Sequence, residues 1–309
     1  QLGSSFHGAL CELFAERMEP DSAFATRIEE WSEARAHPDA LALRAIGGLH
    51  ALVRRGDALA AYYPPHALDH DALWQAVLQT IAREDTFLTR FLDSPPQTNE
   101  VGRSGILLGA ALRLQERGPL AWLELGASAG LNLSFLEYRY QVGFGDPSAQ
   151  VEIPTVWEGN APAIAPLSVS ERAGCDVNPL DPRADRERLL AYVWPDQYAR
   201  ITRTEAALAV AAEAPWQVER APASQWLARK LAEPRDALPV VVHTIVWQYL
   251  PKEERAAITA TLERHTCVRI SVEGDGDPEG AAVTITRYPS GERTLIGRAD
   301  YHGRWVRWS

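Results

Sequence analysis

The stretch Trp122-Leu-Glu-Leu-Gly-Ala-Ser-Ala-Gly-Leu-Asn132 decides the fold class of this chain. A short apolar run, Leu120 to Leu125, leads into Gly126, and a tight turn then passes through Gly130 into an expected helix at 129–138. A strand, a glycine turn and a helix in this order are typical of nucleotide-binding α/β domains. In such domains the missing side chains let the backbone approach a ligand at the carboxyl edge of the sheet.

The same residues also match the G-x-S-x-G nucleophile elbow of serine hydrolases, with Ser128 as the nucleophile. An elbow normally follows a central strand, whereas residues 1–118 are expected to be helical. No His-Gly-Gly-Gly oxyanion loop precedes the turn, and the other triad members would have to be distant residues, Asp275 and His302. The position of the turn after the first strand favours the nucleotide-binding class, and the serine hydrolase stays as an alternative.

Hydrophobic periodicity predicts the elements on either side of this turn. In the first part of the chain, helices are expected at 38–55, starting near Pro38, from Asp71 to residue 92, and at 102–117. Strands are expected later, at 120–125, 168–173, 216–221, 239–247, 267–273, 283–288 and 294–298. Helices at 182–192, 196–213, 223–231 and 252–265 alternate with them, which predicts a parallel sheet covered on both faces. The region from Gly143 to Pro166 is expected to be a long loop that serves as a lid or binding segment.

Composition limits the partners. The 309 residues include 31 basic and 41 acidic side chains, and the net charge of −10 argues against a nucleic-acid-binding protein. No run of about 18 apolar residues occurs, so no membrane partner is expected. The three cysteines, Cys11, Cys175 and Cys267, lack the spacing of a metal site or disulfide framework, which predicts a cytoplasmic protein without a metal. The expected partner is a small-molecule substrate, and a homo-oligomer is left open.

An acidic residue two positions before the first glycine gives the loop the form E-x-G-x-S-x-G. This loop resembles motif I of class I S-adenosylmethionine-dependent methyltransferases, in which the carboxylate and the glycine backbone face the methionine part of the cofactor. The resemblance implies S-adenosylmethionine as the cofactor. It implies cofactor-binding roles for Glu124, Gly126, Ser128, Gly130 and Asn132, although Ser128 departs from the usual central glycine.

Two later positions extend this resemblance. In the methyltransferases an acid at the end of the second strand holds the ribose hydroxyls, because a carboxylate can accept two hydrogen bonds from a diol. Asp176 is the candidate for that role, with a turn or cap residue as the alternative. Ser224, after the third expected strand, is the candidate beside the adenine ring. The expected terminal hairpin also agrees with the antiparallel strand that ends such sheets.

Methyl transfer is an in-line displacement that needs positioning and the removal of one proton. His243 and Tyr249, near the end of the strand at 239–247, and Glu100 are the candidate catalytic residues. For His243 a buried core histidine is the alternative. Asn99 and Arg103 are candidate substrate-binding residues because they supply polar groups and an anion-binding fork in the segment before the first strand. The alternative for that segment is the N-cap of the next helix.

The whole chain also resembles one bacterial family, the domain of unknown function 2332 family. The resemblance is carried by Tyr62-Tyr63-Pro64, Pro96-Gln-Thr-Asn-Glu-Val-Gly-Arg-Ser104, Leu123-Glu-Leu-Gly-Ala-Ser-Ala-Gly-Leu-Asn-Leu133, Gly174-Cys-Asp-Val-Asn-Pro-Leu-Asp181, Trp194-Pro-Asp-Gln197 and His302-Gly303. This resemblance implies a fold and a pattern but no particular reaction.

The sequence therefore predicts an α/β fold with two domains. Residues 96–309 are expected to form a Rossmann-like seven-stranded methyltransferase sheet with a terminal antiparallel hairpin, and residues 1–95 an all-helical domain that roofs the site. The expected function is an S-adenosylmethionine-dependent methyltransferase acting on a small molecule. A non-catalytic or cofactor-sensing protein on a methyltransferase scaffold is a further alternative.

Overall fold

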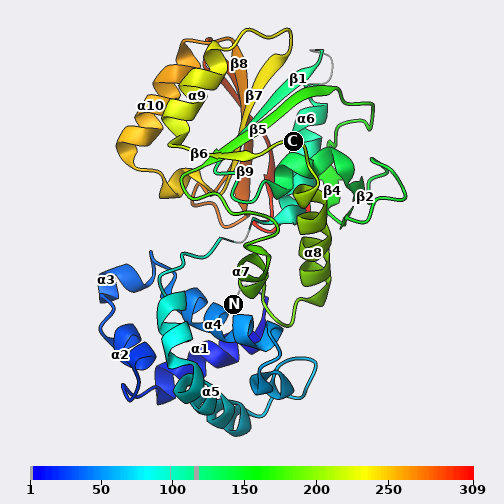
Figure 1. Ribbon diagram of the computed structural model, residues 1–309. Helices are drawn as coiled ribbons and strands as arrows, with labels where there is room; N and C mark the ends of the chain where they lie inside the picture. Colours follow the sequence, from blue (N-terminus) through cyan, green and yellow to red (C-terminus); the bar gives the residue numbers. More distant parts are fainter. Residues whose placement is uncertain (1–2, 98, 115–117) are drawn as a thin grey trace. The chain divides into compact units, whose positions relative to one another are not determined.

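The computed structural model describes residues 3–97, 99–114 and 118–309 and divides into two compact units (Figure 1). The first unit contains Gln1–Thr98 and Ala184–Glu205, and the second contains Asn99–Arg183 and Ala206–Ser309. The helical unit therefore includes a later segment of the chain, which differs from the single boundary expected between residues 95 and 96.

The first unit is helical. Its elements are α1 (Ser5–Arg17), α2 (Ala23–Glu29), α3 (Glu33–Ala36), α4 (Leu41–Arg54), η1 (Ala58–Tyr62), α5 (His70–Phe91), α7 (Arg186–Ala191) and the beginning of α8 (Tyr198–Ala212). Asp69 rather than Asp71 caps α5, since its Oδ1 accepts the amides of Asp71 and Ala72, both at 3.0 Å. The expected start of α4 at Pro38 was also early, because Ala40 is the left-handed residue before its first turn.

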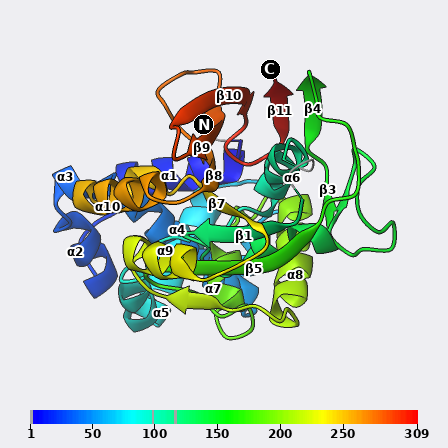
Figure 2. The same cartoon turned by 90° about the horizontal axis from the view of Figure 1, so that it is seen from above.

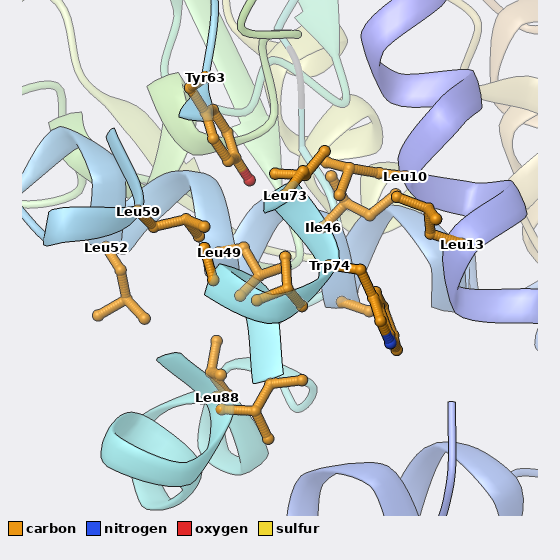
Figure 3. Packing of buried hydrophobic residues seen from close by; sticks show 14 of the residues in the cluster. Leu10, Leu13, Ile46, Leu49, Leu52, Leu59, Tyr63, Leu73, Trp74 and Leu88 are labelled. Atoms are coloured by element: carbon orange, nitrogen blue, oxygen red, sulfur yellow. The ribbon is translucent and has the colours of Figure 1, made fainter. Parts of the chain in front are cut away.

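Two apolar clusters stabilise this unit. The larger one joins α1, α4, η1 and α5 through buried side chains such as Leu10, Leu49 and Trp74 (Figure 3). The smaller one includes Tyr192, which lies just after α7 and packs at a tilt against Phe91 with ring centroids 5.7 Å apart. A Cβ on Gly47 would lie 2.8 Å from the Tyr192 ring. This close packing explains why the segment around α7 belongs to the helical unit.

In the described part of the chain the second unit carries a nine-stranded sheet of order β4-β11-β10-β9-β8-β7-β1-β5-β6. The strands are β1 (Leu120–Leu125), β4 (Val156–Gly159), β5 (Val169–Asp176), β6 (Val218–Arg220), β7 (Leu238–Thr244), β8 (Cys267–Glu273), β9 (Ala281–Tyr288), β10 (Glu292–Ala299) and β11 (Trp305–Trp308). Strands β6, β5, β1, β7 and β8 are parallel, whereas β9, β10 and β11 continue the sheet antiparallel.

The expected count of seven strands was wrong because two short strands were missed. β11 pairs with β4 at one edge, where Figure 2 shows them side by side. β4 lies within the region expected to be a loop, as does β3 (Glu152–Ile153), which pairs with β2 (Arg139–Tyr140) in a separate small sheet. β4 escaped detection because it is largely exposed and lacks the apolar run of a buried strand.

Helices cover both faces of the sheet (Figure 1). On one face α9 (Ala223–Ala232) and α10 (Lys252–Glu263) pack on Leu123 and Leu125. The other face lies against α6 (Ser104–Leu112) and η4 (Leu131–Glu137), and there Trp122 meets Phe135 with ring centroids 4.7 Å apart. Because strand side chains alternate, Glu124 points to the same face as Trp122.

Two expected helices near the glycine turn differ in form. The helix expected at 102–117 begins with the 3-10 turn η2 (Val101–Arg103), continues as α6 to Leu112, and has its expected end at 115–117 outside the described residues. The helix expected at 129–138 is the 3-10 helix η4. The hydroxyls of Tyr138 and Tyr140 donate to the carbonyls of Leu131 and Phe135, which an α-helix would use for its own bonds.

β1 lies between β5 and β7, which are the first and the third of the parallel strands that follow it in the chain. The strand order thus reverses beside β1, and open α/β sheets bind ligands outside the carboxyl ends of strands at such a point. Within the described residues, no helix combines the length and the apolar character needed to cross a membrane.

Candidate functional site

The glycine turn after β1 is tied to the end of β5. The amides of Gly126 and Ala127 both donate to the carbonyl of Cys175, at 2.9 and 3.0 Å. Gly126, Ser128 and Gly130 have φ angles of +69°, +53° and +73°. Three left-handed residues within five positions give a tight turn at the switch point, and one of them is a serine, which adopts this conformation at a cost.

Gly126 also has a packing role within the protein. An ideal Cβ on Gly126 would lie 2.6 Å from the side chain of Val246, in the loop after β7. The missing side chain of Gly126 therefore permits a close approach between two segments of the protein itself. Gly130 is similar, because its Cβ would lie 3.1 Å from Val218 at the start of β6.

Asp176, at the end of β5, holds the turn in place. One carboxylate oxygen accepts the amide of Ser128 at 3.0 Å, and the other accepts the amide of Asn178 at 2.8 Å. The structure thus displays the turn role that the sequence offered as the alternative. An ionised carboxylate has about four lone-pair sites, so these two bonds leave acceptor capacity for a further donor.

Glu124 is the most unusual residue of the site. Its side chain is buried at the carboxyl end of β1, and Oε2 has no hydrogen-bond partner among the described residues. Burial raises its pKa to about 8, an effect that the nearby Asp176 reinforces and the Arg103 charge opposes. The buried Ser128 hydroxyl likewise has no partner in the described part of the chain. Buried polar atoms without partners are rare in folded proteins, and strongly perturbed pKa values cluster at functional sites.

The polar segment before α6 lies against this turn. Asn99 Oδ1 accepts the amide of Leu131 at 3.0 Å and so caps η4. The Arg103 guanidinium donates to the carbonyl of Tyr301 at 2.9 Å and to that of Thr244 at 3.3 Å. Asn99 and Arg103 therefore bind backbone groups around the site, and Arg103 reaches the carboxyl end of β7.

Asn132 has a structural contact of its own. Its Oδ1 accepts the hydroxyl of Ser104 at 2.8 Å, and both residues are buried. This bond links η4 to the start of α6.

Glu100 is buried beside a histidine that sequence reasoning placed elsewhere. Its Oε1 accepts the amide of Gly102 at 3.1 Å, and its Oε2 lies 3.4 Å from Nδ1 of His302. The sequence paired His302 with Asp275, but Asp275 instead forms an ion pair with Arg298 at 2.7 Å. No spacing rule could have found the Glu100–His302 pair, because about two hundred residues separate its members.

His243 is held by both ring nitrogens. Nδ1 lies 2.5 Å from Glu273, and Nε2 accepts a hydrogen bond from Nε of Arg269 at 2.9 Å. An arginine can only donate, so Nε2 must be the unprotonated nitrogen and Nδ1 carries the proton. The ring is fully buried, and burial lowers its pKa. The core alternative thus describes His243 better than a catalytic role, since neither nitrogen faces a substrate.

Two other sequence candidates lie outside this cluster. Tyr249 is 72% exposed in η5 (Trp247–Tyr249). Ser224 is the second residue of α9, and both its amide and its hydroxyl donate to Glu254 of α10, at 2.7 and 2.8 Å. These bonds make Ser224 a link between the two helices.

The geometry required by a serine hydrolase is not found in the described residues. A nucleophilic serine needs an imidazole nitrogen within hydrogen-bond reach, and Ser128 Oγ has no hydrogen-bond partner there. Neither His243 nor His302 is therefore within hydrogen-bond distance of Ser128 Oγ, as expected if the turn belongs to a nucleotide-binding domain. Across the same residues, no group of three or more His, Cys, Asp or Glu side chains could hold a metal ion.

Comparison with known proteins adds one match. A family model described as "Uncharacterized protein conserved in bacteria (DUF2332)" covers residues 1–308. No curated protein and no solved structure matches the chain.

Proposed function

This chain belongs to the DUF2332 family of bacterial proteins, and we propose that it is an S-adenosylmethionine-dependent methyltransferase acting on a small molecule. The observation that carries this proposal is the buried carboxyl of Glu124, whose Oε2 has no partner in the described part of the chain. A carboxyl in this state is destabilising unless a ligand uses it, and it stands where the resembling methyltransferases have their motif I acid.

The order of the strands in the sheet supports the fold that the proposal requires. Its five parallel strands follow the chain order 3-2-1-4-5, which is the order of the corresponding strands in Rossmann-type nucleotide-binding folds. The glycine turn leaves β1, the first of these strands, and Asp176 ends β5, the second. A Rossmann-like methyltransferase sheet, extended by β11 and β4, is therefore the fold that we assign within this proposal.

The residues present fit the cofactor. Glu124 supplies an acceptor for the ammonium of the methionine part, and the unpartnered hydroxyl of Ser128 lies in the same turn. Asp176 keeps acceptor capacity for the ribose diol. When bound, the cofactor supplies a methyl group on a positively charged sulfur. The protein contributes a negative charge at Glu124, which is costly to create in the empty site and is stabilised once a cation lies beside it.

Thermal unfolding tests the proposal. S-adenosylmethionine or S-adenosylhomocysteine at 100 times its dissociation constant should stabilise the protein by about 2.7 kcal/mol. For a unit of this size that raises the melting temperature by about 5 °C. Glu124→Gln should lose most of this shift, because an amide cannot pair with the ammonium, whereas Glu158→Gln on the exposed β4 should keep it. The absence of a shift with both compounds at millimolar concentration would contradict the proposal.

A further inference from the structure

Glu100 and His302 place a carboxylate within ion-pair distance of an imidazole, although the two facing atoms share no hydrogen bond. Glu100 is 2% exposed, and Nδ1 of His302 is buried 3.4 Å from its Oε2. The His302 side chain as a whole is nonetheless 26% exposed. Because Nδ1 is buried, the exposed surface of the side chain belongs to its other atoms, among them Nε2 and the ring carbons.

The backbone that carries this pair is packed closely. A Cβ on Gly102 would lie 2.3 Å from the carbonyl oxygen of His302, and a Cβ on Gly303 would lie 2.2 Å from Gly102. The Thr155 hydroxyl joins the two segments, because its single proton lies between the carbonyl oxygens of Gly303 at 2.7 Å and Gly102 at 3.2 Å. These contacts hold the backbone segments that carry Glu100 and His302 side by side, although the two residues are far apart in the sequence.

The pair also lies at the carboxyl edge of the sheet. Arg103 follows Glu100 by three residues, and its guanidinium binds both the carbonyl of Tyr301 and that of Thr244, at the end of β7. The same guanidinium acts electrostatically on Glu124 at the end of β1. His302 is therefore next to the switch point and not at a remote part of the second unit.

We propose that His302 is the proton acceptor for the substrate and that Glu100 is the residue that positions it. This inference rests on the proposed methyltransferase function. In the transfer, the lone pair of the acceptor atom forms the new bond to the methyl carbon, and the carbon–sulfur bond breaks with its electron pair going to sulfur. The proton of the acceptor passes to Nε2 of His302, and the carboxylate of Glu100 stabilises the imidazolium.

This role narrows the substrate class. A base is needed where the acceptor atom carries a proton that must leave during transfer, as in a hydroxyl, an amine or a thiol. The inferred substrate is thus a small molecule with an O–H, N–H or S–H acceptor, and not a carbon that is already nucleophilic.

Acylation by diethyl pyrocarbonate provides a test that needs no substrate. The reagent modifies unprotonated imidazoles, and peptide mass mapping at pH 7.5 follows each histidine separately. We expect His302 to react at a rate comparable with that of the exposed His37, whereas the buried His243 should not react. Saturating S-adenosylhomocysteine should slow the reaction of His302 at least about fivefold and leave His37 unchanged.

Variants test the role of Glu100. Glu100→Gln keeps an oxygen that can accept the Gly102 amide, and it should slow acylation of His302 about tenfold by removing the charge behind the ring. Asp275→Asn is the matched control, because Asp275 pairs with Arg298 and should leave the rate at His302 unchanged.

The outcomes separate this inference from the function on which it rests. A flat calorimetric titration with S-adenosylhomocysteine would overturn the methyltransferase proposal and this inference with it. Measured binding without protection of His302, or a His302 as unreactive as His243, would overturn the inference alone. An unchanged rate in a folded Glu100→Gln protein would remove Glu100 from the proposed pair.

Discussion

At the scale of single residues, Glu124 makes stability depend on pH. Its pKa is about 8 in the folded protein against an ordinary value of 4.5, so between these values the unfolded chain is ionised while the folded one keeps its proton. Unfolding then releases a proton, and the free energy of unfolding falls as pH rises from about 4.5 to 8. The buried carboxyl thus gives a stability signature that is independent of any ligand.

The substitution Glu124→Gln should remove this slope, because the amide is neutral at every pH. We expect urea unfolding to give equal stabilities near pH 4 and an advantage of at least about 1 kcal/mol for the variant near pH 8.5. Glu158→Gln, on the exposed strand β4, should follow the parent at both pH values. Stability curves of parent and Glu124→Gln that stay parallel from pH 5 to 8.5 would show that Glu124 is ionised when buried.

The methyltransferase and serine hydrolase hypotheses assign different roles to Ser128, a turn residue in the first and the nucleophile in the second. Ser128→Gly should stabilise the protein by about 1 kcal/mol by relieving the φ of +53°. Ser128→Ala keeps that strain and removes a buried hydroxyl without a partner in the described residues, so its effect should stay within about 0.5 kcal/mol. Fluorophosphonate should not label the parent, and a label on Ser128 would support the hydrolase.

At the scale of elements, the sequence predicts the buried strands well. The bounds of β1 (Leu120–Leu125) and β8 (Cys267–Glu273) are as expected, because a largely apolar run marks β1 and alternating apolar residues mark β8. The helical character of residues 1–118 was expected, but α1 was given no bounds although Phe6, Leu10 and Leu13 follow helical spacing. β11 was missed because four residues are too few for a pattern.

The candidate site was predictable only in its local part. The glycine turn, Glu124 and Asp176 are marked by their positions relative to the strands β1 and β5. His302 could not be assigned, because only the tertiary contact between the segments around Gly102 and Gly303 brings it to Glu100. The role of Gly126 also depends on a distant partner, Val246.

Contact between the glycine turn and the loop after β7 can be measured. Gly126→Ala adds a Cβ 2.6 Å from Val246 at a φ of +69°, so we expect a loss of about 2 kcal/mol or more. Gly291→Ala, at a φ of +73° with nothing within 4 Å, measures the backbone cost alone. Val246→Ala in the Gly126→Ala background should recover the excess over Gly291→Ala. If the double-mutant cycle shows additive losses, the two segments do not touch.

At the scale of the whole molecule, the chain forms two units that are not divided by one boundary. The segment Ala184–Glu205 leaves the second unit and returns to the helical one, where Tyr192 packs on Phe91 and its hydroxyl donates to the carbonyl of Ser94 at 2.8 Å. The order of helices and strands along the sequence could not predict that this segment belongs to the helical unit, because its pattern is also that of a helix connecting two strands of the sheet.

Tyr192→Ala tests this division. The residue is 2% exposed, and removing its ring should destabilise the helical unit by about 3–5 kcal/mol. We expect amide hydrogen exchange to accelerate in α4, α5 and α7, while β1 and β7 keep their protection. Equal acceleration in both units would show that they unfold together.

The central claim is that the turn between β1 and η4 binds S-adenosylmethionine through Glu124. The most direct measurement is a crystal structure of the protein grown with saturating S-adenosylhomocysteine. The account predicts the ligand outside the carboxyl ends of β1 and β5, with its ammonium at Glu124 and its ribose hydroxyls at Asp176. An empty turn at saturating ligand, or a ligand bound away from Glu124, would contradict it.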